Sequence, residues 1–148
     1  MNVDYRMAPT YAHPVPGNDS WTALQWVFSK AHSLGIDADR ISVGGLSAGG
    51  QIAAVLALRA RDAAMPLVLQ MLIVPCVDAR FVPIEGGAYG APYESYTTCE
   101  FAPCLPLQRM RWFYNLWLGT DVGESWVLLT DASGVYVSFC QEEMDVWI

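Results

Sequence analysis

Charged residues are scarce in this chain of 148 residues, and basic ones are the scarcest. Lysine and arginine number 8 against 15 acidic residues and form no cluster, which disfavours nucleic-acid binding. Histidine occurs only twice, and the four cysteines include no Cys-x-x-Cys pair, so we expect no metal site and no other cofactor. Because no secretory leader is evident, we expect reduced thiols and a cytoplasmic protein.

Long apolar runs are missing as well. The longest, over residues 66–77, is interrupted by Gln70 and is too short to span a bilayer, so the sequence predicts no transmembrane segment. Even so, 53% of the residues are hydrophobic, which excludes a disordered chain and is high for a soluble protein of this size. The length suits a single domain.

The stretch around Ser47 has a combination of features that no other part of the chain shows. An apolar segment suited to a short buried strand precedes it, and residues 51–61 are rich in helix formers. Between them, Gly45 and Gly49 flank Ser47 in the pattern Gly-x-Ser-x-Gly. A strand that turns sharply into a helix needs small residues at those two positions, so the pattern predicts a nucleophile elbow.

Such a turn has a chemical consequence for Ser47 and for the residue after it. The turn exposes the serine hydroxyl and places the N-terminus of the next helix beside it. The backbone N–H of Ala48 would then face a developing oxyanion. We therefore expect Ser47 to be a nucleophile and Ala48 to supply one oxyanion donor. The alternative is an ordinary glycine-rich loop, which the flanking strand and helix disfavour.

The segment before the elbow predicts a strand end at residues 2–6 and then a helix. Asp19 or Ser20 is the expected cap of that helix, and Gly35 is expected to end it. Apolar residues recur at helical spacing along it and predict one buried face, made of Trp21, Leu24, Val27, Phe28 and Ala31.

A further buried strand is expected over residues 67–74, after the elbow helix. Strands that alternate with helices predict an α/β fold with a parallel sheet and helices on both faces. Residues 78–106 read as a long loop, residues 107–118 as a helix, and residues 127–129 and 134–139 as short strands.

Three short segments of the sequence occur in an order and spacing that can be compared with known families. They are VDYRMAP at residues 3–9, GGLSAGG at residues 44–50, and a strand followed by proline within residues 70–78. In this order and spacing they resemble the hormone-sensitive-lipase-like branch of the α/β-hydrolases, a group of carboxylesterases, lipases and arylacetamide-deacetylase-like enzymes. The resemblance covers residues 2–123 and implies a partial α/β-hydrolase domain at 1–123 with a divergent tail at 124–148.

The resemblance implies hydrolysis of small carboxylic esters through an acyl-enzyme on Ser47. It also implies machinery for which this chain shows no counterpart. The family's glycine-rich oxyanion loop lies upstream of the VDYR segment, and its catalytic Asp and His lie downstream in settings that do not occur here. Several carboxylates follow the serine without the family's setting, so we interpret them as solvated: Asp121, Asp131 and Asp145.

Both histidines, His13 and His32, precede Ser47, whereas the triad order in this fold is serine, acid, histidine. We interpret them as surface or structural residues. We therefore expect a truncated hydrolase with impaired activity. The alternative is a non-catalytic pseudo-enzyme or interaction fragment, and a peptidase or amidase on the same fold cannot be separated from an esterase by sequence. The oligomeric state stays open.

Overall fold

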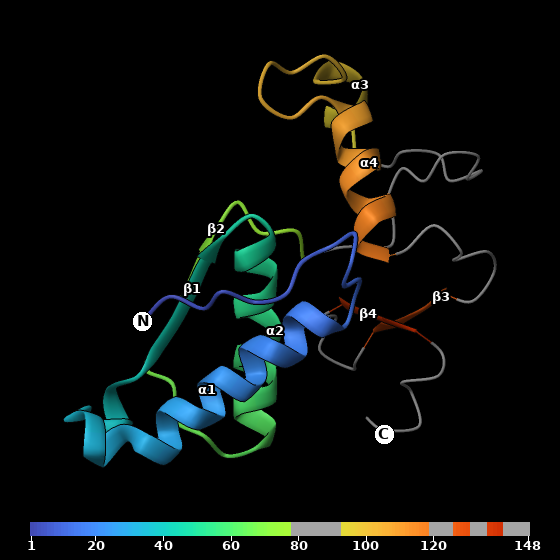
Figure 1. Cartoon of the computed structure of the whole chain (residues 1–148). Coiled ribbons are helices and arrows are strands. Elements are labelled where there is room, and N and C mark those ends of the chain that lie inside the picture. Colours follow the sequence, from blue (N-terminus) through green and yellow to red (C-terminus); the bar gives the residue numbers. More distant parts are fainter. Residues whose placement is uncertain (78–92, 119–125, 131–135, 141–148) are drawn as a thin grey trace. The chain divides into compact units, whose positions relative to one another are not determined.

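The computed structural model describes residues 1–77, 93–118, 126–130 and 136–140, and of the last two ranges the backbone alone (Figure 1). The chain divides into two compact units. One is made of residues 1–7 and 14–77, and the other of residues 8–13 together with the chain from residue 78 onward. Each unit is described by itself.

The first unit follows the predicted alternation of helices and strands (Figure 1). Its elements are, in order, α1 (Val15–Leu34), the short 3-10 helix η1 (Ala38–Arg40), β1 (Ser42–Leu46), α2 (Ala48–Asp62) and β2 (Leu69–Ile73). The two strands pair in parallel, with Ser42 opposite Leu69 and Leu46 opposite Ile73. The predicted α/β fold with a parallel sheet is confirmed.

The start of α1 differs from the prediction. The helix begins at Val15, ahead of both expected caps, with Pro16 in its first turn. Proline suits that position because its missing N–H would have no partner in the helix and its fixed φ is helical. Ser20 is buried inside the helix and its hydroxyl donates to the carbonyl of Pro16 at 2.8 Å. The predicted end is confirmed, since Gly35 takes a left-handed conformation with φ of 67°.

The core of the first unit lies between α1 and α2. Its buried apolar cluster comes from both helices and from the residue just before β1: Leu24, Val27, Ile41, Leu56 and Ala60. Trp21 and Phe28 pack against it from the side and are partly buried. The buried face predicted for α1 is therefore confirmed.

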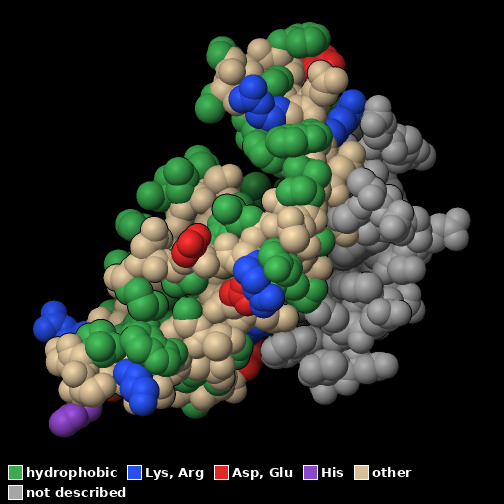
Figure 2. Space-filling view, in the orientation of Figure 1, with side chains coloured by type: hydrophobic (Ala, Val, Ile, Leu, Met, Phe, Trp, Pro, Cys, Tyr) green, Lys and Arg blue, Asp and Glu red, His purple; other side chains and the backbone are tan. Residues whose placement is uncertain are grey.

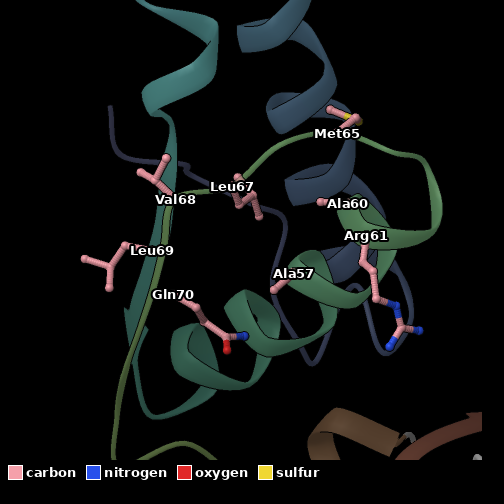
Figure 3. Close-up of a pocket in the computed structure, with 8 residues that line it drawn as sticks. All are labelled: Ala57, Ala60, Arg61, Met65, Leu67, Val68, Leu69 and Gln70. Carbon is pink, nitrogen blue, oxygen red and sulfur yellow. The ribbon is translucent and has the colours of Figure 1, made fainter.

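One face of the β1–β2 pair is open among the described residues. Helix α2 packs on the other face, where the Gln70 side chain donates to the carbonyl of Ala53 at 3.3 Å. Figure 3 shows Gln70 reaching toward α2 while Leu69 points away from it. Four apolar side chains lie exposed on the open face (Figure 2): Leu46, Leu69, Met71 and Ile73. The expectation of buried strands is wrong here, because the described helices cover one face only.

The N-terminal residues 1–7 join no strand, although the sequence predicts a strand end there. They are fixed to α1 through Arg6, whose guanidinium donates to both carboxylate oxygens of Asp19 at 2.7 and 2.9 Å. The backbone N–H of Arg6 adds a third bond to Asp19 at 3.1 Å. These hydrogen bonds lower the pKa of Asp19 to about 2.

The second unit contains α3 (Ser95–Thr98), α4 (Leu107–Leu118) and the antiparallel pair β3 (Trp126–Thr130) and β4 (Tyr136–Cys140). The predicted helix over 107–118 and the two short strands near the end of the chain are confirmed. Within α4, Tyr114 is buried, whereas Phe113 is about half exposed and contacts the ring of Trp112. The domain division at residue 123 stays a prediction.

Three cysteines in the described ranges are free thiols, as the sequence predicts: Cys76, Cys99 and Cys104. None of the helices that the structure describes is long and apolar enough to cross a membrane.

Candidate active site

Ser47 sits at the turn between β1 and α2, as the pattern predicts. It is the single residue between the last residue of the strand, Leu46, and the first of the helix, Ala48. Its backbone has φ of 54° and ψ of −117°, a conformation that residues with a side chain rarely adopt. Strain of this kind persists only where the surroundings enforce it, and it is concentrated at functional sites.

Backbone hydrogen bonds on both sides hold this strained turn in place. The N–H of Ser47 donates to the carbonyl of Ile73 at 2.9 Å, and its carbonyl accepts from the N–H of Gln51 at 3.0 Å. The first bond ties the turn to the end of β2, and the second starts α2. The side chain of Ser47 does not cap the helix and is exposed. The hydroxyl is therefore left pointing out of the backbone network.

Close packing explains why Gly45 lacks a side chain. A Cβ atom on Gly45 would collide with the backbone of Gly49 and would lie 2.7 Å from the backbone nitrogen of Gly50. Gly50 is also restricted, because a Cβ there would lie 3.0 Å from the carbonyl oxygen of Gly45 and 3.2 Å from the Cβ of Pro75. The first turn of α2 thus rests directly on the strand.

Gly49 does not match the expectation that it must be small for packing. A Cβ atom there would meet no described atom within 4 Å. The requirement falls instead on Gly50, which sequence reasoning missed. The signals available were the second glycine of the pair and the proline after the next strand, since a glycine often marks a place where another segment approaches the backbone closely.

The end of β2 forms the other half of the site. Val74 has φ of 43°, which is a true outlier for a β-branched residue, and it is exposed. It stands between Ile73, which bonds to Ser47, and Pro75, which packs on Gly50. Two strained residues therefore meet at one end of the sheet, at the carboxyl ends of both parallel strands, where ligands bind in open α/β folds.

The N-terminus of α2 makes the surroundings of Ser47 favourable for negative charge. The N–H groups of the first helical turn, beginning with Ala48, have no acceptor within the helix. They carry the positive end of the helix dipole. No acidic side chain occupies this first turn, and the basic residues Arg59 and Arg61 are at the far end. Ala48, the residue predicted to donate to the oxyanion, is thus an exposed residue at a helix N-terminus.

Neither histidine lies at the carboxyl end of β1 within the first unit. His32 is exposed in the last turn of α1, close to the amino end of β1, whereas Ser47 follows the carboxyl end. At about 3.3 Å per residue, the strand alone separates those ends by roughly 16 Å. His13 belongs to the second unit, where its ring stacks edge-on against Trp117 with centroids 5.1 Å apart. Its backbone N–H donates to the Trp117 carbonyl at 2.8 Å.

Four aspartates after Ser47 were considered from the sequence. Asp78, Asp121, Asp131 and Asp145 lie outside the described residues. The site that the structure describes therefore consists of the strained serine, the helix N-terminus and the end of β2.

Comparison with known proteins gives one family. A family model described as alpha/beta hydrolase fold matches residues 1–139. An AB hydrolase superfamily protein of Schizosaccharomyces pombe is 39% identical over 124 residues, which cover 82% of this chain and 34% of that protein. A carboxylesterase of Mycobacterium tuberculosis is 51% identical over 80 residues, or 53% of this chain and 25% of that protein.

Solved structures agree with these relatives. A structure described as a bacterial heroin esterase superposes with a TM-score of 0.69 at 34% identity, covering 80% of this chain and 35% of that one. The chain thus spans about a quarter to a third of the length of the relatives it matches.

Proposed function

This chain belongs to the α/β-hydrolase family, in the branch of esterases similar to hormone-sensitive lipase, and on that premise we propose that Ser47 is the nucleophile of a carboxylic ester hydrolase. The substrates we propose are small carboxylic esters, because relatives are named carboxylesterase and ethyl acetate hydrolase. The observation that carries the proposal is the strained, exposed turn at Ser47, with φ of 54°.

The proposed reaction has two halves. In the first, the Oγ atom of Ser47 bonds to the carbonyl carbon of the ester and gives up its proton. The bond between that carbon and the alcohol oxygen then breaks, the alcohol leaves with a proton, and an acyl-enzyme remains. In the second half, water adds to the acyl carbon, the bond to Oγ breaks, the acid is released and Oγ regains its proton.

The N-terminus of α2 supports this chemistry electrostatically. Each half-reaction passes through a tetrahedral intermediate whose oxygen carries negative charge. We assign the N–H of Ala48 as one donor to that oxygen. Loss of a single oxyanion donor in serine hydrolases costs about 10²–10³-fold in turnover, so this one N–H is a sizeable part of the machinery.

The described site shows no general base beside Ser47. Neither His13 nor His32 lies at the carboxyl end of β1 within the unit that holds Ser47. Without a base the serine stays protonated, and oxyanion donors and binding alone leave roughly 10³–10⁴-fold acceleration over water. We therefore propose that the 148-residue chain by itself hydrolyses esters slowly.

The test is hydrolysis of p-nitrophenyl acetate by the purified chain, followed at 400 nm, alongside covalent labelling with a fluorophosphonate. The Ser47→Ala variant removes the proposed nucleophile. Ser33→Ala is the matched control, because Ser33 is an exposed serine on α1 whose hydroxyl donates only to the carbonyl of Lys30 within its own helix.

We expect labelling of the parent chain and of Ser33→Ala, and none of Ser47→Ala. Labelling that survives in Ser47→Ala would overturn the assignment of the nucleophile. Fast turnover in the parent chain that vanishes in Ser47→Ala would keep the nucleophile but overturn the proposal that the base is missing.

A non-catalytic interaction module is the second candidate, and the open face of the sheet favours it. Four exposed apolar side chains on that face, with Leu46 next to Ser47, form a surface of the kind that partners cover. In this case the elbow would serve only as scaffold, and the fluorophosphonate would label neither the parent chain nor its variants.

A further inference from the structure

Val74 lies opposite Ser47 at the carboxyl end of the β1–β2 pair. The last pair of the register joins Leu46 and Ile73, and Ser47 and Val74 are the next residues along the two chain segments. The N–H of Ser47 donates to the carbonyl of Ile73 at 2.9 Å, which continues the evenly spaced bonds of a parallel ladder by one step. Neighbouring strands lie about 4.8 Å apart, so the backbones of Ser47 and Val74 are close.

The ladder ends at this pair of residues. The next bond would need an N–H from Pro75, which has none. The carbonyl of Ser47 instead accepts from the N–H of Gln51 and starts α2. Both residues of the pair leave the strand conformation, with φ of 54° at Ser47 and 43° at Val74. Their side chains therefore no longer follow the alternation of the sheet, and both residues are exposed.

Folding alone does not explain a valine at position 74. A positive φ is costly for a β-branched residue, and a residue before proline is also restricted to extended conformations. Glycine would take this φ without a steric penalty. The side chain is not needed for packing either, because Val74 is 72% exposed. Strained residues are concentrated at active sites and at places that clamp a ligand, which suggests that the exposed side chain contacts a ligand.

We propose that Val74 is a specificity-determining residue whose side chain contacts the acyl group of an ester bound at Ser47. This inference rests on the proposed role of Ser47 as the nucleophile. In the acyl-enzyme the acyl carbon is bonded to Oγ of Ser47, so the acyl chain begins beside the residue that faces Ser47 across the ladder. An apolar, branched side chain at that place favours a longer apolar acyl chain over acetyl.

The size of the preference follows from the apolar surface that the acyl chain removes from water. Butanoate has two methylene groups more than acetate. Full burial of one methylene group is worth about fourfold in affinity. Two methylene groups that Val74 covers on one side are about half buried, which gives roughly fourfold in kcat/KM.

The experiment compares p-nitrophenyl acetate with p-nitrophenyl butanoate, which share one leaving group, on the full chain. Release of p-nitrophenolate at 400 nm gives kcat/KM for each ester after the rate with Ser47→Ala is subtracted. We expect the parent chain to prefer butanoate about fourfold and Val74→Asn to show no preference. Asparagine accepts a positive φ more readily than valine, so this variant changes the polarity of the side chain while it eases the backbone.

Val68→Ala is the matched control for the substrate preference. Val68 is an exposed valine at the opposite end of β2, immediately before the strand. Its N–H donates to the carbonyl of Ile41 at 2.9 Å, and alanine keeps that bond. The preference for butanoate should therefore stay at the parent value. For the strain itself we compare two glycine variants by urea unfolding, and we expect Val74→Gly to unfold at a higher urea concentration than Val68→Gly.

The outcomes separate this inference from the proposed function. An unchanged preference in Val74→Asn, with turnover that still depends on Ser47, would overturn the contact with the acyl group and leave the proposed function standing. No release that depends on Ser47 in the parent chain would overturn the proposed function, and this inference with it. The reverse order of the two glycine variants would overturn the strain from which the contact is argued.

Discussion

The backbone N–H of Ser47 donates to the carbonyl oxygen of Ile73 at 2.9 Å, so the turn that carries the serine is tied to the end of the neighbouring strand. The strained conformation of Ser47 thus depends on β2 as well as on the elements on either side of the turn. A change at the end of β2 is expected to reach the serine without touching it.

Gly45 and Gly49 flank the serine symmetrically in sequence, and we expect them to respond very differently to alanine. A Cβ on Gly45 would collide with the backbone of Gly49, whereas a Cβ on Gly49 would meet nothing described within 4 Å. Gly45→Ala should destabilise the chain by roughly 3 kcal/mol or more, or prevent folding. Gly49→Ala should change stability by less than about 1 kcal/mol, because alanine favours the helix. Urea unfolding of both variants checks this, and equal effects would contradict the packing described.

Ser47→Gly and Ser47→Ala should separate chemistry from strain. Both remove the hydroxyl, and both should abolish fluorophosphonate labelling. Glycine, however, tolerates φ of 54° without a steric penalty. Alanine has a Cβ atom and therefore retains that penalty. We expect Ser47→Gly to be more stable than Ser47→Ala by about 1 kcal/mol in urea unfolding. The opposite order would mean that the turn is not strained.

Leu24 should be an anchor of the small core. It is 6% exposed and lies in the cluster between α1 and α2. Leu24→Ala is expected to cost about 2–5 kcal/mol, through lost burial and the cavity left behind. Leu34→Ala on the same helix is the control, since Leu34 is 47% exposed and should cost less than about 1 kcal/mol. Thermal melting of the two variants distinguishes them.

The Arg6–Asp19 pair should make stability depend on pH in the acid range. The pKa of Asp19 is lowered from 3.8 to about 2, chiefly by the hydrogen bond from the Arg6 side chain. The folded state therefore favours the charged carboxylate, and the stabilisation is present above about pH 4 and lost as the pH falls through 2.

Asp19→Asn tests this pH dependence. At pH 7 the variant should melt below the parent chain, and the gap should close between pH 4 and pH 2. Raising the salt concentration should shrink the gap at pH 7, because the pair is exposed. A gap that stays constant with pH would assign the effect to something other than this carboxylate.

Much of the first unit was predictable because its signals are local. The apolar spacing along α1, the glycine at its end and the pattern around Ser47 each act within a few residues. They predicted the buried face of α1, its end and the sharp turn at Ser47, which are confirmed, whereas the packing role expected of Gly49 was wrong. The start of α1 was predicted wrongly, because Asp19 or Ser20 was expected to cap the helix. The Ser20 hydroxyl instead donates within the helix to the carbonyl of Pro16, and Asp19 binds Arg6. The proline, not the serine, marks the first turn.

Other features depend on distant parts of the chain and leave no local signal. The close approach of Gly50 to Pro75 joins residues that are far apart in sequence. The exposure of the strands also depends on distant parts of the chain. An apolar strand sequence such as that of β2 predicts burial whether or not another element covers the strand. The interpretation of the histidines rests on their order in the sequence and stays a prediction. His32 lies exposed on α1, and the ring of His13 packs against Trp117.

The open face of the β1–β2 sheet also has a consequence for the lifetime of the protein. Chaperones and proteases recognise exposed apolar segments of this kind, since these are what unfolded chains display. Met71 and Ile73 are about half exposed in the folded chain, so folding alone does not hide them. We expect the rate at which proteases degrade the chain to be set by how quickly that face is covered, rather than by how stably the helices pack.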